Sequence, residues 1–206
     1  MIIATPLGDA RVVTAAAPSA ALTLVLGHGA GGGIDARDLV ALAAALPERG
    51  VTVLRLEQPW RVAGRKVAGP PATLDRAWVA ALATLDIGGP LVVGGRSAGA
   101  RVACRTAVAV GAIGCLALAF PLHPPGRPEQ SRLGELVGAG VPTLVLQGER
   151  DAFGAPDAFP RKRGSYDVIA VPGADHSFRV TKPHDHGVTL AALAARAGDW
   201  LLALVR

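Results

Sequence analysis

The chain has little of several residue types that mark particular classes of protein. Its 206 residues include two cysteines, one methionine and 4% aromatic residues, and only 18% of the residues are charged. Cys104 and Cys115 have neither a C-x-x-C nor a zinc-type spacing, which excludes a disulfide framework and a cysteine metal centre. We expect both to be buried free thiols in a reducing cytoplasm. Because half of the residues are hydrophobic and few are aromatic, we expect an ordered, aliphatic core.

Long hydrophobic runs are absent as well. The longest uncharged apolar run, residues 108–120, is too short to cross a bilayer. Residues 1–6 lack the charged segment and the long apolar core of a signal peptide. The chain contains no repeat, low-complexity tract or composition shift that would divide it. The sequence therefore predicts one domain over residues 1–206, located in the cytoplasm and without a membrane partner.

Clustered charge is also missing, although the chain carries a formal net charge of +5. The basic residues are scattered, and the densest run is Arg-Lys-Arg at residues 161–163. No aromatic residues are interleaved with the basic ones in the pattern that stacks nucleic-acid bases. We expect solvated surface charge and no nucleic-acid partner, with an anion-binding face as the alternative.

What the chain does have is a regular alternation of short apolar runs with longer amphipathic or Ala-rich stretches. The short runs predict strands over residues 10–14, 22–26, 51–56, 91–93, 113–118, 143–146 and 166–171. The longer stretches predict helices over residues 35–49, 74–85, 98–110, 133–137 and 189–205. Thr73 is the expected N-cap of the second of these helices.

Continuous apolar strands that alternate with helices indicate a mostly parallel sheet covered on both faces. Right-handed crossovers then make a doubly wound α/β fold of about six or seven strands. The loops 57–72 and 120–141 are long, but each is too short to form a cap domain. Ligands of such folds bind beyond the carboxyl ends of the strands. The candidate residues below all follow an expected strand, so the pattern places them at one edge of the sheet.

The most specific motif is Gly-Arg-Ser-Ala-Gly at residues 95–99, between an apolar strand and an Ala-rich helix. A serine on such a turn is held in a strained conformation, and the flanking glycines let backbone segments pass close together. The turn exposes the hydroxyl of Ser97 and leaves the N–H of Ala98 free for an anion. The motif therefore predicts a serine nucleophile.

A nucleophilic serine requires a base, and His176 follows the last expected strand in a Gly-containing loop. A carboxylate must hold that base in the correct tautomer. Asp151 follows the strand at residues 143–146 and is the expected carboxylate, with Glu149 and Asp157 as alternatives.

The loop His-Gly-Ala-Gly-Gly-Gly at residues 28–33 follows another expected strand. We expect the N–H of Ala30 to join that of Ala98 in an oxyanion hole. Gly-rich loops also bind phosphate, but the patterns of a P-loop and of a dinucleotide-binding turn are absent. His184 and His186 form a His-x-His pair without a third ligand nearby. We therefore expect no cofactor and no metal.

Further residues near this edge are candidates for contact with a substrate. We single out His28, Arg96 and His123; the loop residues that also lie within reach are Trp60, Arg61, Arg65 and Lys66. The alternative for each is an ordinary surface or packing role. Arginines that face the pocket would favour an anionic acyl substrate.

Taken together, these residues resemble the α/β-hydrolase superfamily, and within it the small, capless branch similar to dienelactone hydrolases. Residues 120–126, Phe-Pro-Leu-His-Pro-Pro-Gly, and residues 146–154, Leu-Gln-Gly-Glu-Arg-Asp-Ala-Phe-Gly, are similar to stretches typical of that branch. The chain order Ser97, Asp151, His176 is the order of α/β-hydrolases. The resemblance implies an open site that hydrolyses an ester or thioester of a small acyl substrate through an acyl-enzyme.

The nucleophile separates this chain from dienelactone hydrolases proper, which are associated with a cysteine where Ser97 stands. Dienelactone is therefore not the expected substrate. Two other functions fit the same residues. One is an acyltransferase on the same site, and the other is a non-catalytic interaction protein that retains the fold. The residues predict no particular oligomeric state.

Overall fold

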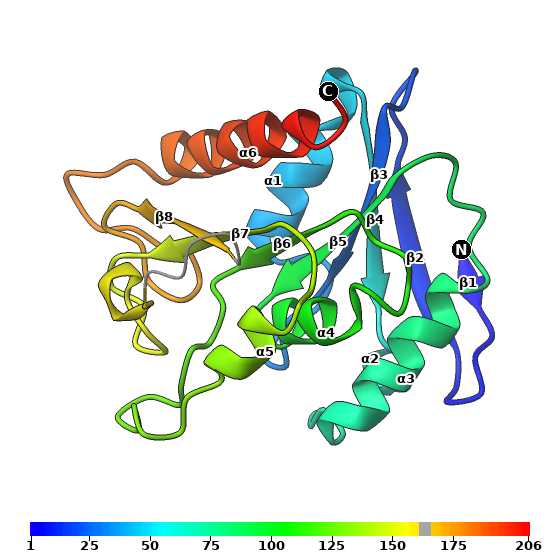
Figure 1. Ribbon diagram of the computed structural model, residues 1–206, viewed down its shortest axis with the longest axis horizontal. Coiled ribbons are helices and arrows are strands. Elements are labelled where there is room, and N and C mark those ends of the chain that lie inside the picture. Colours follow the sequence, from blue (N-terminus) through cyan, green and yellow to red (C-terminus); the bar gives the residue numbers. More distant parts are fainter. Residues whose placement is uncertain (161–165) are drawn as a thin grey trace.

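The computed structural model describes residues 1–160 and 166–206, and in this part the chain forms one eight-stranded sheet (Figure 1). The strands lie in the order β1-β2-β4-β3-β5-β6-β7-β8. Their bounds are β1 Ile2–Ile3, β2 Ala10–Ala15, β3 Leu22–Gly27, β4 Val51–Glu57, β5 Leu91–Arg96, β6 Gly114–Leu118, β7 Thr143–Gly148 and β8 Asp167–Val171. From β4 to β8 neighbouring strands run parallel, whereas β1 and β2 are antiparallel at one edge. The predicted α/β fold is confirmed. The basic run at residues 161–163, for which solvated surface charge was expected, lies outside the described residues.

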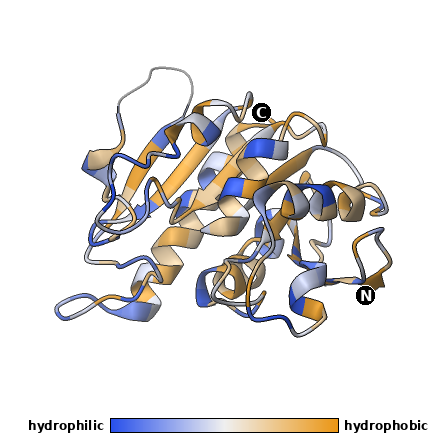
Figure 2. Ribbon diagram, turned by 90° about the horizontal axis from the view of Figure 1, so that it is seen from below, coloured by the Kyte–Doolittle hydropathy of each residue, from blue (hydrophilic) through white to orange (hydrophobic). Residues whose placement is uncertain are grey.

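The helices cover both faces of this sheet. They are α1 Arg37–Ala45, α2 Pro59–Val62, α3 Pro71–Leu82, α4 Ala98–Thr106, α5 Leu133–Val137 and α6 His186–Ala203. Helices α1 and α6 pack on one face, and α3, α4 and α5 pack on the other. Because both faces are covered, every residue of β3, β6 and β7 is buried, whereas the edge strand β2 alternates between buried and exposed positions. The central strands are accordingly hydrophobic along their length (Figure 2).

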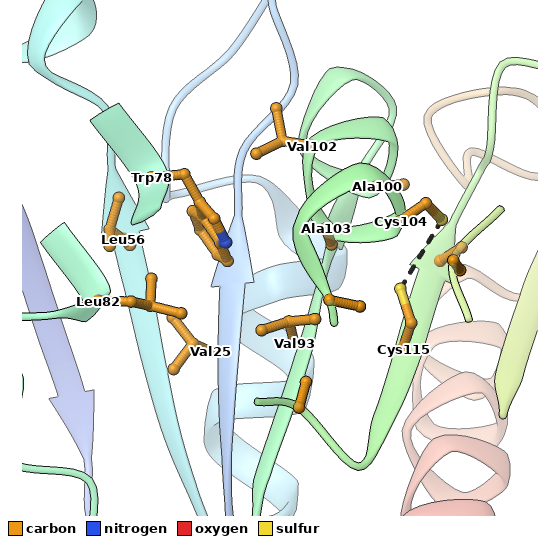
Figure 3. Close-up of a cluster of buried hydrophobic side chains, with 14 of the residues drawn as sticks. Val25, Leu56, Trp78, Leu82, Val93, Ala100, Val102, Ala103, Cys104 and Cys115 are labelled. Carbon is orange, nitrogen blue, oxygen red and sulfur yellow. Dashed lines mark hydrogen bonds between the residues drawn. The ribbon is translucent and has the colours of Figure 1, made fainter. Parts of the chain in front are cut away.

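The core is aliphatic apart from a few aromatic rings, as expected. On the α3–α4 face, the buried indole of Trp78 lies among small and branched side chains from the strands and helices (Figure 3). The sulfur atoms of Cys104 and Cys115 lie 3.7 Å apart there, and both thiols are buried and free. Their hydrogen bond and their burial raise the pKa of the Cys115 thiol, which keeps it protonated and unreactive.

Several helix ends differ from the prediction, each for a local reason. Helix α3 begins at Pro71, so Thr73 is not its N-cap; proline at the first helical position has the correct φ and needs no N–H partner. Helix α1 ends at Ala45 because a 3₁₀ turn, Pro47–Arg49, follows. Helix α6 begins earlier than expected because the Asp185 carboxylate accepts from the Val188 N–H at 2.9 Å.

Two short elements lie where no regular structure was expected. Strand β1 has only two residues, and helix α2 lies within the predicted loop 57–72. Among the described elements no inserted domain covers the carboxyl edge of the sheet, as expected for a capless fold. No helix of the described residues is long and apolar enough to span a membrane.

Candidate active site

Ser97 lies on a tight turn between the last residue of β5 and the first residue of α4. Its φ of 53° and ψ of −112° place a non-glycine residue in a strained region of backbone conformation. A Cβ on Gly95 would lie 2.6 Å from the carbonyl oxygen of Gly27, and one on Gly99 would meet the same carbonyl. Both glycines are therefore needed because β3 passes directly beside the turn.

The side chains of Ser97, His176 and Asp151 form a continuous hydrogen-bonded line. His176 Nε2 lies 3.0 Å from Ser97 Oγ, and His176 Nδ1 lies 2.8 Å from Asp151 Oδ2. Because a carboxylate only accepts, Nδ1 carries the proton and Nε2 is free to accept from the serine hydroxyl. The ring of Phe153 packs against the imidazole at 4.2 Å between centroids, which restricts its rotation.

Asp151 is buried and its carboxylate is fully engaged. Besides His176, its Oδ1 accepts from the Phe153 N–H at 2.8 Å, and its Oδ2 accepts from Gln147 Nε2 at 2.9 Å. The alternative carboxylates lie elsewhere. Glu149 is exposed and accepts from the Gly173 N–H, and Asp157 is exposed in a 3₁₀ turn.

Gln147 is a site residue that the sequence analysis did not identify. It is fully buried in β7, and its Nε2 also lies 2.7 Å from the Gly154 carbonyl oxygen. The amide therefore ties the strand to the loop that contains Asp151. A polar residue inside an otherwise apolar strand is the signal that would have pointed to it.

The two backbone groups expected to form an oxyanion hole belong to the residue after Ser97 and to the loop after β3. Ala98 is the first residue of α4, so its N–H has no partner within the helix. In the described residues, no backbone hydrogen bond uses the N–H of Ala30. The loop that contains Ala30 passes close to the serine, because a Cβ on Gly29 would lie 3.4 Å from Ser97 Cβ.

His28 holds that loop in place. It is buried, its Nδ1 lies 2.9 Å from the Gly29 carbonyl oxygen, and its Nε2 accepts from the Gln58 N–H at 3.1 Å. Burial lowers the pKa of His28, which favours the neutral ring that these two bonds require. Both ring nitrogens are occupied, so neither is available to a substrate.

Arg96 precedes Ser97 and is also turned inward. Its Nη2 donates to the His176 carbonyl oxygen at 2.9 Å, and its Nε lies 3.4 Å from Asp38 Oδ2. Burial raises the pKa of the Asp38 carboxyl, and the Arg96 guanidinium opposes that shift. Asp38 lies in the first turn of α1, and no motif in the sequence singles it out.

His123 lies in the loop after β6. It is half-buried, its Nδ1 lies 2.9 Å from the Pro124 carbonyl oxygen, and its N–H donates to Phe153. This places it beside the loop that contains Asp151.

The remaining candidates are spread over the loop after β4. Trp60 and Arg65 line a groove of about 620 Å³, whereas Arg61 is half-buried and Lys66 is exposed. Within the described residues, no group of three or more His, Cys, Asp or Glu side chains is arranged to hold a metal ion. His186 Nε2 instead lies 3.1 Å from Arg37 Nη1.

Solved structures of similar fold include several proteins that are described as hydrolases. An α/β serine hydrolase homologue from Coxiella burnetii has a TM-score of 0.77 at 18% identity, over 98% of this chain and 96% of that one. A dienelactone hydrolase from Anabaena variabilis has a TM-score of 0.77 at 18% identity, over 100% and 97%. An α/β serine hydrolase without a lid, from Xanthomonas campestris, has a TM-score of 0.68 at 21% identity, over 97% and 93%. At these identities the likeness concerns the fold.

No curated protein matches the sequence. A family model described as an alpha/beta hydrolase domain matches residues 20–205, which is nearly the whole chain. Together with the sheet order and the turn at Ser97, this match shows that the chain belongs to the α/β-hydrolase family.

Proposed function

We propose that the protein is a serine hydrolase that cleaves an ester or thioester of a small acyl substrate. The observation that carries this proposal is the line from Ser97 Oγ through His176 to Asp151, with contacts of 3.0 and 2.8 Å. A serine on a strained turn, a base within hydrogen-bonding distance and a buried carboxylate behind that base are the parts that acyl transfer to serine requires.

In the proposed reaction, Ser97 Oγ attacks the acyl carbonyl carbon while His176 Nε2 takes the hydroxyl proton. Asp151 stabilises the imidazolium, and the N–H groups of Ala30 and Ala98 bind the oxyanion. When the tetrahedral intermediate collapses, His176 gives its proton to the leaving alcohol or thiol. A water molecule then loses a proton to His176 and attacks the acyl-enzyme, which releases the acid and restores Ser97.

This proposal changes the roles of the residues that the sequence indicated as candidates for contact with the substrate. His28 shapes the oxyanion loop from behind, because its ring nitrogens are bonded to Gly29 and Gln58. His123 remains a candidate for contact with the substrate. The absence of an inserted domain among the described elements supports a small or polar acyl group, since long apolar chains require cover from water.

Labelling with a fluorophosphonate, followed by peptide mass spectrometry, tests the nucleophile. The wild type is compared with Ser97→Ala and His176→Ala, and the exposed serine variant Ser19→Ala is the control. We expect the label on the Ser97 peptide of wild type and control only. Turnover of short p-nitrophenyl esters and thioesters should fall by about 10³-fold or more in both site variants.

The outcomes separate the alternatives. Folded wild-type protein that neither takes the label nor turns over an ester would exclude the proposed activity and favour a non-catalytic interaction protein. Transfer of the acyl group to an added alcohol, in place of release of the free acid, would indicate an acyltransferase on the same residues.

A further inference from the structure

Two charged side chains lie beside the proposed site without a part in the reaction itself. The side chain of Asp38 is 1% exposed and that of Arg96 is 15% exposed, and their closest atoms lie 3.4 Å apart. Charged groups are rarely buried to this extent unless they are paired, because each loses its hydration. The pair links the first turn of α1 to the end of β5.

The guanidinium of Arg96 also reaches the backbone of the proposed base. Its Nη2 donates to the carbonyl oxygen of His176 at 2.9 Å. Arg96 and Ser97 are consecutive, so this bond connects the turn that holds the nucleophile with the loop that holds the base. Among the described residues, the other backbone hydrogen bonds of residues 175–179 are local, because the N–H groups of Ser177 and Arg179 both donate to the carboxylate of Asp175.

We infer that Arg96 is a positioning residue that fixes the backbone of His176 relative to Ser97, with Asp38 as its buried counter-ion. This inference rests on the proposed function for its catalytic consequence. It differs from the expectation that Arg96 binds the substrate, because Nη2 donates to the His176 carbonyl oxygen and Nε faces Asp38 in an ion pair.

The shape of the arginine side chain is what this role needs. Its Nε faces Asp38 while its Nη2 faces His176, so one planar group makes both contacts at once. A lysine keeps the charge but has a single nitrogen, which is unable to make both contacts in this geometry. Arg96→Lys therefore removes the bridge and retains the charge, whereas Asp38→Asn removes the counter-ion and retains the arginine.

The chain offers a matched control. Arg105, near the end of α4, is 18% exposed and pairs with Asp75 and Glu135, so it resembles Arg96 in burial and pairing. It has no contact with the loop of His176 among the described residues. Arg105→Lys thus shows how the loss of a half-buried, paired arginine that does not contact the His176 loop affects kinetics and hydrogen exchange.

The experiment compares wild type, Arg96→Lys, Asp38→Asn and Arg105→Lys in two measurements. Steady-state kinetics on a neutral and an anionic p-nitrophenyl ester give kcat and KM. Hydrogen exchange by mass spectrometry reports the opening of residues 175–179. We expect Arg96→Lys to lower kcat by about tenfold on both esters, with KM unchanged within about twofold, because a displaced base slows the reaction without weakening binding.

Exchange in residues 175–179 should be faster in Arg96→Lys. Asp38→Asn should change both measurements in the same direction by less, and Arg105→Lys should match wild type. A rise in KM for the anionic ester alone, with kcat unchanged, would overturn the inference in favour of substrate binding.

Unchanged kcat and unchanged exchange in folded Arg96→Lys would overturn it as well. If Arg96→Lys does not fold, as judged by thermal unfolding, Asp38→Asn carries the test. If the wild type turns over neither ester, the proposed function fails, and the exchange comparison still decides whether Arg96 holds the loop.

Discussion

Acidification is expected to destabilise the protein through His28. This residue is buried between the loop that contains Ala30 and the end of β4, with its Nδ1 at the Gly29 carbonyl and its Nε2 at the Gln58 N–H. A second proton on the ring would sit on Nε2 and face the Gln58 N–H, so a donor would oppose a donor at 3.1 Å. The folded protein therefore resists protonation of His28.

The sign and the size of the effect follow from the pKa values in the two states. Burial lowers the pKa of His28 in the folded protein below the value of 6.5 that applies to the unfolded chain. The stability that the neutral ring contributes is complete above pH 6.5 and is lost as the pH falls below it. At pH 5.5, protonation of His28 stabilises the unfolded chain by RT ln 11. The free energy of unfolding therefore falls by at most about 1.4 kcal/mol.

Urea denaturation of wild type and His28→Gln at pH 7.5, 6.5 and 5.5 measures this effect. The glutamine keeps an acceptor near the Gln58 N–H but does not titrate. At pH 7.5 the wild type should be more stable by about 1 kcal/mol, because the variant loses the bond to Gly29. At pH 5.5 this difference should shrink by up to about 1.4 kcal/mol.

The exposed His184 supplies the control, and His184→Gln should follow the wild type at every pH. If wild type and His28→Gln lose stability in parallel between pH 7.5 and 5.5, then the buried ring of His28 is not the group that responds to acid, and the assignment of its tautomer is wrong.

Two further predictions concern backbone crossing and an ion pair. Gly95→Ala would bring a Cβ within 2.6 Å of the Gly27 carbonyl oxygen and 2.7 Å of the Gly99 carbonyl carbon, which are both backbone atoms. We expect a loss of about 2–4 kcal/mol in urea denaturation together with the loss of fluorophosphonate labelling, and a stable, labelled variant would contradict the crossing. Burial acts to raise the pKa of Glu135, but the charges and hydrogen bonds of Arg101 and Arg105 outweigh that effect. The pKa of Glu135 therefore lies below its usual value of 4.5. Its contribution to stability is therefore present above pH 4.5 and lost in acid, so Glu135→Gln should cost about 1–2 kcal/mol at pH 7 and little at pH 3; an equal cost at both would refute the pairing.

Most of the fold follows from local patterns. Each short apolar run forms a strand within a few residues of its predicted position, because burial on both faces of a parallel sheet requires uninterrupted apolar sequence. The errors are at element ends, where a single contact decides. Pro71 displaced the expected cap at Thr73, and the Asp185 carboxylate extended α6 toward the N-terminus. Strand β1 is too short to have a periodicity of its own and forms only by pairing with β2.

The sequence by itself determined the turn at Ser97 and which loops follow the carboxyl ends of the strands, since both depend on residues adjacent in the chain. It thereby selected His176 and Asp151 as partners for the serine, and their place in the reaction stays a prediction. Only the tertiary structure decided what surrounds them. Gln147 beside Asp151, and Arg96 between Asp38 and the His176 backbone, are contacts between elements far apart in the chain. No local pattern encodes them, because the direction of a buried polar side chain is set by which partner the folded packing brings within reach.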